Sequence, residues 1–358
     1  GNKPSTISKL SSLIGQRRAE VAAAKVEAAK SFGPGCFSVL AHEAAHERKP
    51  PNHYDLDMYT CAPDVLALDG PKRPCVRHNV PSVPGAFVLS DVLSDAECRE
   101  LRALSETMGY RPDVPLSSAL DERAQNVVMY ATDAQSEALF SRVKDLLPPE
   151  IGDEKLLCLN RRWRLYRYHA GNVYRKHLDG AWPASGTRTG RNGAPQYVYD
   201  AYSGSARSKF TFIVYLNDDC EGGCTTFFVP QPDTEGQSEG TLDAQPVQPR
   251  VGCATVFPHG ETPVPLLHEG STVVSGVKYL LRTEVVYQVR ETPAAEKEAA
   301  RLRGLVRTLG GLGGADLKEG MSAGPDAKDA KKFGSKKTVV KGHLKKRRDK
   351  KAGGEREG

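Results

Sequence analysis

From about residue 156 onward, the chain is a series of short segments that favour β structure. Their β-branched and aromatic residues favour strands, and loops rich in Gly and Pro separate them, the longest being 180–207 and 230–250. Many short strands joined in this way predict a sandwich, barrel or jelly roll. The segments are 162–168, 210–217, 225–229, 254–257, 264–268 and 279–289.

The region before these strands is predicted to be partly helical. An Ala-, Lys- and Glu-rich stretch, 5–31, is spaced for one helix, whereas 33–78 shows no clear period and reads as an irregular connector. Beyond it we expect a strand over 86–89 and two helices. The first starts at a cap formed by Ser94 or Asp95 and runs through Met108, and the second covers 133–147, ending before Pro148-Pro149.

These patterns divide the chain into four parts. Residues 1–78 are an N-terminal helix and irregular extension, and 79–155 are a strand and helix region that supports the core. Residues 156–290 are the β core. Residues 291–358 are a helix to about Leu309 followed by a Lys-rich tail with too little apolar surface to fold alone.

The net charge of +6 is unevenly placed. Residues 326–358 hold 13 Lys or Arg against 5 Asp or Glu, a balance of +8, so the rest of the chain carries −2. The body therefore lacks the basic surface usual in a nucleic-acid-processing core. The run Lys345–Lys351 predicts a nuclear-import signal, a contact for nucleic acid or another anionic surface, or a solubilising tail. We expect a cytoplasmic or nuclear protein.

The cysteines, the apolar runs and the first residues of the chain limit the kind of protein further. Eight cysteines in 358 residues do not make a disulfide scaffold, so we expect reduced thiols, with a Cys220–Cys224 or Cys61–Cys75 bond as alternatives. The sequence contains no run of about 18 or more apolar residues, so it predicts no membrane span. Gly1 and Ser5 fit the N-myristoylation spacing if a Met was removed, or Gly1 is a cloning remnant.

The chemistry is expected at a His-x-Asp pair, His177 and Asp179, in strand-like surroundings. Residues two apart on a strand project to the same side, so imidazole and carboxylate can reach one ion together. The third ligand is expected to be His268, at the end of the segment 264–268. Two His and one carboxylate leave open positions on Fe(II) for a co-substrate and O₂, unlike a closed structural zinc site.

Ten residues after His268 comes Lys278, on a predicted strand with Arg282 four residues further on the same side. A cation on a barrel wall is costly to bury without an anion. The distal carboxylate of 2-oxoglutarate would supply that anion to Lys278, with Arg282 as a second cofactor-binding residue. The alternative is that both point to solvent.

These segments resemble the prolyl 4-hydroxylase-type group of 2-oxoglutarate/Fe(II) oxygenases over about 84–290. The resemblance is carried by Tyr168-His-Ala-Gly-Asn-Val-Tyr174-Arg-Lys-His177-Leu-Asp179, Phe212-Ile-Val-Tyr215-Leu-Asn217, Gly222-Gly223 and His268-Glu-Gly270 with Lys278. One departure is Cys224-Thr-Thr, where relatives often have an acidic residue before Thr.

The resemblance implies a mainly β fold with flanking helices (α+β), its core a double-stranded β-helix of the jelly-roll or cupin-like kind. It implies that His177, Asp179 and His268 bind Fe(II) and are the catalytic centre. It also implies that Tyr215 and Tyr168 lie beside 2-oxoglutarate and Tyr174 nearer the substrate. The implied reaction uses O₂, with ascorbate as reductant, and releases succinate and CO₂ while hydroxylating a C–H bond of a prolyl residue in a protein or peptide.

Loop 180–207 is expected to close over the substrate, because it is Gly-rich and carries Trp182, Tyr197, Tyr199 and Tyr202. Trp182 is therefore a candidate substrate residue. The simpler alternative is that Trp182 is an exposed loop residue and that the tyrosines pack in the core.

Three other functions fit parts of the sequence. His42-Glu-Ala-Ala-His46 matches the zinc-protease motif, but Pro50-Pro51 follows at once, and a surface helix with incidental histidines is the favoured interpretation. A nucleic-acid-demethylating oxygenase would suit Arg282 but not the near-neutral body. A non-catalytic β-helix interaction module is disfavoured because the three metal ligands and Lys278 are all present.

Overall fold

The structure is a computed structural model that separates one unit, Gly1–Glu291, from a second, Thr292–Gly358. The predicted helices over 5–31 and after 291, and the basic tail, lie outside the described residues. No helix in the described part of the chain is long and apolar enough to cross a membrane. The structure describes residues 32–62, 64–70, 73–116, 124–191, 193–230, 242–260, 262–263 and 265–289.

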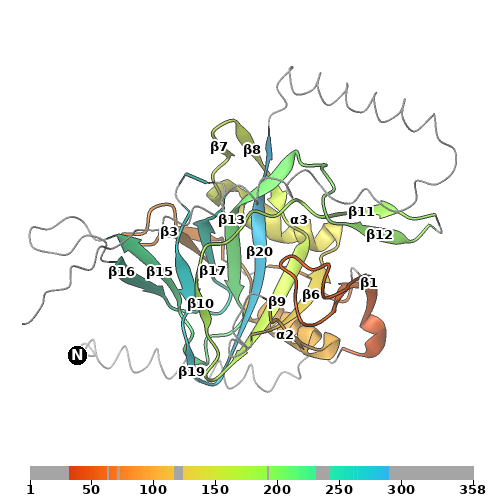
Figure 1. Cartoon of the computed structure of the whole chain (residues 1–358), viewed down its shortest axis with the longest axis horizontal. Coiled ribbons are helices and arrows are strands. Elements are labelled where there is room, and N and C mark those ends of the chain that lie inside the picture. The colour runs from red at the N-terminus through yellow and green to blue at the C-terminus, as the bar shows by residue number, and fades with distance from the viewer. Residues whose placement is uncertain are drawn as a thin grey trace, which may run out of the picture. The chain divides into compact units, whose positions relative to one another are not determined.

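Two β-sheets form the body of the first unit (Figure 1). The larger sheet has the order β1 (Phe37–Glu43), β2 (Leu56–Cys61), β6 (Gln125–Tyr130), β9 (Arg162–His169), β20 (Val277–Val289), β13 (Ala206–Tyr215), β17 (Ala254–Pro258), β4 (Phe87–Ser90), β3 (Val76–Asn79). The smaller sheet has the order β10 (Tyr174–His177), β18 (His268–Gly270), β15 (Thr225–Pro230), β16 (Leu242–Val247).

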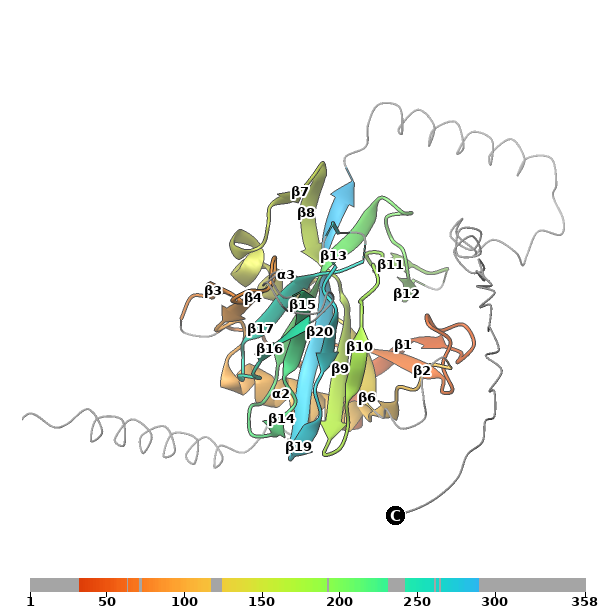
Figure 2. The same ribbon diagram turned by 60° about the vertical axis from the view of Figure 1, so that its left-hand side comes forward.

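Short strands complete the pairing. They are β5 (Arg111–Pro112) on β6, β7 (Glu150–Ile151) on β8 (Glu154–Leu159), β8 on β20, β11 (Gly186–Thr189) on β12 (Pro195–Val198), and β14 (Glu221–Gly222) on β19 (Val273–Ser275). In both ribbon views the β11–β12 hairpin lies on the same side of the unit as β1 (Figures 1 and 2).

The chain crosses between the two sheets in a regular way. It runs through β9, β10, β13, β15, β16, β17, β18 and β20, which gives the spatial orders β9-β20-β13-β17 and β10-β18-β15-β16. All pairings among these eight strands are antiparallel. This is the strand order of a double-stranded β-helix, as the sequence predicts.

Alternation along the strands divides the apolar interior into two parts. On β13, Phe212 and Val214 belong to a core shared with the helices, whereas Ile213 and Tyr215 face the space between the sheets. Period-two alternation on a strand has this effect because successive side chains project to opposite faces. The space between the sheets therefore holds the residues that the strands turn inward, including Tyr168.

Two helices cover the large sheet and support it. α2 (Asp95–Met108) begins at a capping box of Ser94 and Glu97, and α3 (Asp133–Val143) at one of Thr132 and Gln135. A short 3₁₀ turn, Lys144–Leu146, follows α3, and another, Pro34–Cys36, precedes β1. Leu101, Leu104 and Leu139 are buried against the sheet. Both predicted helices are confirmed. α3 ends four residues before the predicted limit of 147, and the 3₁₀ turn that follows ends one residue before it.

Three local predictions are wrong. The connector 33–78 contains β1, β2 and β3, and the predicted loops 180–207 and 230–250 contain the β11–β12 hairpin and β16. β1 and β3 lie at the two edges of the larger sheet, and all four residues of β3 are exposed, so neither shows the burial alternation of an inner strand. His268 begins a strand and does not end one, since β18 covers His268–Gly270.

The cysteines agree with the first of the predicted alternatives. All eight are free thiols, including Cys61, Cys75, Cys220 and Cys224. Burial raises the pKa of the Cys98 thiol well above its usual range, so this sulfur behaves as a buried apolar group.

Candidate metal and co-substrate site

His177 and His268 lie directly opposite each other on paired strands β10 and β18. Their ring centroids are 4.3 Å apart. Nδ1 of His177 lies 2.6 Å from the carbonyl oxygen of Arg175, and Nδ1 of His268 lies 3.0 Å from that of Leu266. A carbonyl only accepts, so each Nδ1 carries the proton and each Nε2 keeps a free lone pair.

Asp179 completes the group from just beyond the end of β10. Its Oδ1 is 3.3 Å from Nε2 of His177, and its Oδ2 is 3.6 Å from Nε2 of His268. The three ligand atoms lie within 4.8 Å of one another, and no other such group occurs among the described residues. The predicted convergence is confirmed. The reason given for it is only partly right, because Asp179 is outside the strand.

The protonation states favour metal binding. Burial lowers the pKa of His268 to about 4, so its ring is neutral at pH 7. Burial alone would raise the pKa of Asp179, but Arg282, His177 and His268 together hold it well below its usual range. The neutral ring of His268 and the ionised carboxylate of Asp179 are forms that bind a divalent metal.

Two further side chains orient the Asp179 carboxylate. Thr211 donates its hydroxyl to Oδ2 at 2.7 Å, and Nη2 of Arg282 lies 2.8 Å from Oδ1. Arg282 is buried and does not point to solvent. Residues that hold a metal ligand in place tune its affinity for the metal. The role predicted for Arg282, binding the co-substrate, stays a prediction, and its contact with Asp179 was not foreseen.

Lys278 is buried between the sheets, on the same strand as Arg282. Its Nζ donates to the carbonyl oxygen of Gly223 at 2.6 Å and lies 5.6 Å from the ring centroids of Tyr168 and Tyr215. No carboxylate of the described chain pairs with it, and burial lowers its pKa to about 8. A buried ammonium group without an anionic partner favours the binding of an anion.

One cavity joins the metal-ligand group to Lys278. It is lined by Tyr166, Tyr168, Tyr174, His177, Asp179, Ile213, Thr225, His268, Glu269, Gly270, Lys278, Leu280 and Arg282. Tyr174 packs edge-on against His177, with ring centroids 4.2 Å apart. Tyr215 is not among the lining residues, but its hydroxyl donates to Thr225, which is, at 2.8 Å.

Trp182 lies away from the lining of this cavity. Its ring stacks on the guanidinium group of Arg164, 4.3 Å from the ring centroid, and packs near Tyr199. The loop that carries it is held down, because Trp182 and Ser208 exchange hydrogen bonds at 2.8 Å. The predicted substrate contact of Trp182 and the closing movement of 180–207 stay predictions.

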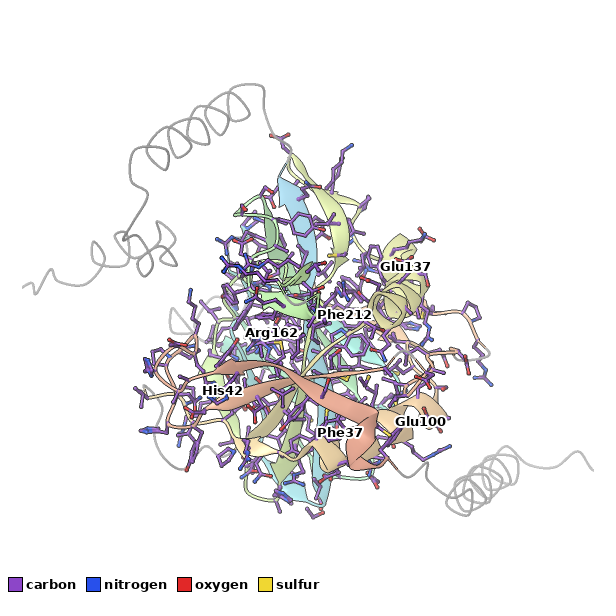
Figure 3. All side chains as sticks on the ribbon, turned by 90° about the vertical axis from the view of Figure 1, so that its right-hand side faces the viewer. Phe37, His42, Glu100, Glu137, Arg162 and Phe212 are labelled. Carbon is purple, nitrogen blue, oxygen red and sulfur yellow. The ribbon has the colours of Figure 1, made fainter. Side chains whose placement is uncertain are left out.

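The segment that matches the zinc-protease motif is a strand followed by a turn, so the expected surface helix is wrong. His42 lies on β1 (Figure 3), with its Nδ1 2.9 Å from Oδ1 of Asp57. Glu43 pairs with Arg162 at 2.6 Å, and His46 is exposed beyond the strand. On a strand the two histidines do not share the helical face that the protease chemistry requires. A second cleft beside His42, Asp55 and Asp57 holds no converging set of metal ligands among the described residues.

No protein-family model matches the sequence, and no curated protein does. A viral collagen prolyl hydroxylase from Paramecium Bursaria Chlorella virus-1, in complex with 2OG, is 18% identical over 57% of this chain and 96% of its own, with a TM-score of 0.34.

Two further solved structures are of the same kind. A Pseudomonas putida prolyl-4-hydroxylase is 18% identical over 58% of this chain and 94% of its own, with a TM-score of 0.35. A prolyl hydroxylase from Trichoplax adhaerens, in complex with a hypoxia inducible factor peptide fragment, is 14% identical over 57% and 84%, with a TM-score of 0.38. The fold assignment rests on the strand order of the two sheets and not on these TM-scores.

Proposed function

We propose that this protein is a 2-oxoglutarate- and Fe(II)-dependent dioxygenase that hydroxylates a C–H bond, releasing succinate and CO₂. A prolyl residue in a protein or peptide is the favoured substrate. The observation that carries the proposal is a single cavity lined by both the His177, Asp179 and His268 group and the buried, unpaired Lys278.

The donor set fits ferrous iron. Two imidazole nitrogens and one carboxylate on one side of a metal leave positions open for exogenous ligands, as in non-haem Fe(II) oxygenases. Both histidines present Nε2 with Nδ1 engaged by a backbone carbonyl, which fixes the ring orientation. When bound, Fe(II) and 2-oxoglutarate supply the oxidising chemistry with O₂.

The residues of the chain would bind the co-substrate and exclude water. Lys278 offers a cation to the distal carboxylate, and burial makes that attraction stronger than it would be in water. The hydroxyl of Tyr215, held by Thr225 and Thr255, lies near the same end and would donate to the co-substrate in place of Thr225. Tyr168 packs beside Lys278 and keeps water from the site.

The substrate side is inferred to lie at Tyr174, which contacts His177 and lines the cavity. The prolyl assignment is supported by the resemblance of the segments around residues 168–179, 212–217 and 268–278 to prolyl 4-hydroxylases. Ascorbate as reductant, and the basic tail as a contact for nucleic acid, are predictions from the sequence alone.

The test is to incubate the protein with Fe(II), 2-oxoglutarate, ascorbate and proline-containing peptides. Succinate is measured, and the peptides are examined by mass spectrometry for the gain of one oxygen atom. His177→Ala should abolish both products, and Lys278→Ala should abolish them at low 2-oxoglutarate. His169→Ala is the matched control, because His169 is exposed at the end of β9 and should keep full activity.

Each outcome distinguishes the proposed reaction from an alternative. Succinate without peptide oxidation would support the co-substrate reaction and move the acceptor away from proline. No succinate from folded protein that binds Fe(II) would overturn the proposed reaction. If binding of nucleic acid falls steeply with salt after the tail is deleted, a demethylating oxygenase becomes the better proposal.

A further inference from the structure

Glu284 is a buried carboxylate on β20, two residues beyond Arg282. Its Oε1 binds Nη2 of Arg164 and lies 3.9 Å from Nε of Arg282. Its Oε2 accepts a hydrogen bond from Nδ2 of Asn160 at 3.2 Å. Because Arg282 also pairs with Asp179, Glu284 is one residue removed from a metal ligand.

The other partners of Glu284 lead to the segment 182–185. Asn160 donates from Nδ2 to the carbonyl oxygen of Pro183 at 3.2 Å and accepts from the amide of Ser185 at 3.2 Å. Arg164, which Glu284 binds, lies under the ring of Trp182. The segment that follows Asp179 is therefore held at its start by Arg282 and Thr211, and a few residues later by Asn160 and Arg164.

We propose that Glu284 is a positioning residue that couples metal binding at Asp179 to the conformation of segment 182–185, which carries Trp182. This inference rests on the metal site of the proposed function. The sequence gives no role to Glu284, Asn160 or Arg164, although Glu284 continues the alternation of Lys278 and Arg282 on one face of β20.

The coupling has a direct electrostatic cause. Arg282 is attracted by Asp179 on one side and by Glu284 on the other. A divalent cation on Asp179 offsets the charge of that carboxylate, so the balance of attraction moves toward Glu284. Arg164 and Asn160 bind the same Glu284 carboxylate, so a shift of Arg282 toward Glu284 changes the attraction on both residues. Arg164 contacts Trp182 and Asn160 contacts Pro183, so the segment 182–185 moves with them. Coupling is reciprocal, so an ordered segment 182–185 should strengthen metal binding.

A merely structural cluster of charges would behave differently. Such a cluster would stabilise the fold whether or not metal is bound, and its loss would lower stability without changing the metal affinity of folded protein. The test must therefore measure metal binding and the environment of Trp182 separately from stability.

Co(II) is the probe, because it suits the same ligands and its visible absorption reports coordination. The full chain is titrated with Co(II) while absorption and tryptophan fluorescence are recorded. There are two tryptophans, and Trp163 is fully buried against the helices, so Trp182→Phe shows which part of the fluorescence change belongs to Trp182. Circular dichroism confirms folding of each variant.

Glu284→Gln keeps the volume and removes the charge. Arg282 then acts on Asp179 without a counter-charge, so Co(II) affinity should fall by about tenfold, the low end of what orienting residues contribute. The Trp182 response should disappear. Glu154→Gln is the matched control, since it breaks the 3.0 Å pair of Glu154 on β8 with Lys209 on β13, on the other side of β20. It should leave both readouts unchanged.

Asn160→Ala is the second variant, and it separates the two arms. It cuts the contacts with Pro183 and Ser185 but leaves Arg164 in place under Trp182, so the Trp182 response should shrink, and Co(II) affinity should fall by less than in Glu284→Gln. Unchanged affinity in folded Glu284→Gln, or equal losses in Glu154→Gln, would overturn the inference.

If Glu284→Gln does not fold, the Asn160→Ala result decides alone: a Trp182 response of unchanged size refutes the coupling. The proposed function fails on a different observation, namely Co(II) binding that survives His177→Ala or absence of binding in the unaltered protein. In that case the inference fails with it. Loss of succinate formation alone would leave the coupling intact, because neither readout depends on turnover.

Discussion

Nη2 of Arg282 lies 2.8 Å from Oδ1 of Asp179, and both side chains are buried. Burial by itself lowers the pKa of Arg282, but Asp179 and its other neighbours raise it above its usual range, so the guanidinium stays charged. In the absence of metal, this cation balances the charge of Asp179. The pair therefore makes the ligand group compatible with folding before metal arrives.

Arg282→Gln should destabilise the metal-free protein by about 3 kcal/mol, because it leaves a buried carboxylate without its cation. A divalent metal should recover part of this loss, since it supplies positive charge at the same carboxylate. Urea unfolding with and without Mn(II) measures both quantities. Arg188→Gln, on the exposed β11–β12 hairpin, is the control and should cost little. An equal loss in both metal states would contradict the explanation.

Thr211→Val should weaken metal binding by about tenfold and leave the fold intact, because it removes the hydroxyl that donates to Oδ2 of Asp179. The affinity for Co(II), measured by absorption, is the readout. Thr226→Val removes a hydroxyl on β15 of the smaller sheet that contacts Ser271, just after β18, and this variant should bind Co(II) normally. Similar affinities in the two variants would show that Thr211 does not orient the ligand.

Binding of 2-oxoglutarate to the metal-loaded protein should be constant below about pH 8 and weaken above it, by up to about tenfold per pH unit. The reason is that the charged form of Lys278 binds the dianion, and burial brings the pKa of this lysine down to about 8. Because the folded value lies below the ordinary value of 10.5, stability without co-substrate should rise between these two pH values.

Calorimetric titration at pH 7, 8 and 9 with Mn(II) under nitrogen provides the check on Lys278. Lys278→Met should bind weakly at every pH, which separates the lysine from other groups that titrate. A wild-type affinity that does not change between pH 7 and 9 would remove Lys278 from the co-substrate site.

Tyr215→Phe should weaken 2-oxoglutarate binding by about fivefold, the size expected for one hydrogen bond. It should change Co(II) affinity little, because Tyr215 does not contact the metal ligands through any described hydrogen bond. Tyr287→Phe is the matched control: it also removes a buried hydroxyl, but one that donates to Pro148 outside the cavity. Equal co-substrate affinity in the two variants would contradict the role of Tyr215.

The sequence predicted the parts of this molecule that depend on local pattern. α2 and α3 carry Ser94 and Thr132 as caps, and the inward-facing strands have β-branched and aromatic residues. The convergence of His177, Asp179 and His268 was predicted because a His-x-Asp pair and a distant His, each in a strand-like segment, seldom occur together for structural reasons alone. The role of Lys278 was predicted because a lysine buried on a barrel wall is costly unless an anion pairs with it.

The parts that escaped prediction depend on tertiary pairing. The strand β1 lies at the edge of the larger sheet, and a register shift between Val39 and Ala41 breaks its alternation, so only its pairing with β2 makes it a strand. The contact of Arg282 with Asp179 joins residues far apart in the sequence, and so does that of Asn160 with Glu284. The alternation of Lys278, Arg282 and Glu284 along one strand was the available signal for the second of these contacts.

The position of His177 directly across from His268 has a consequence for assembly of the small sheet. If β18 slid by one residue, its histidine would project to the opposite face and the ion would lose a ligand. Only the native alignment of β10 and β18 therefore gains the free energy of chelation. In a cell, the concentration of available iron would then affect how often β10 and β18 pair in the native register. When iron is scarce, chains with β18 out of register should accumulate.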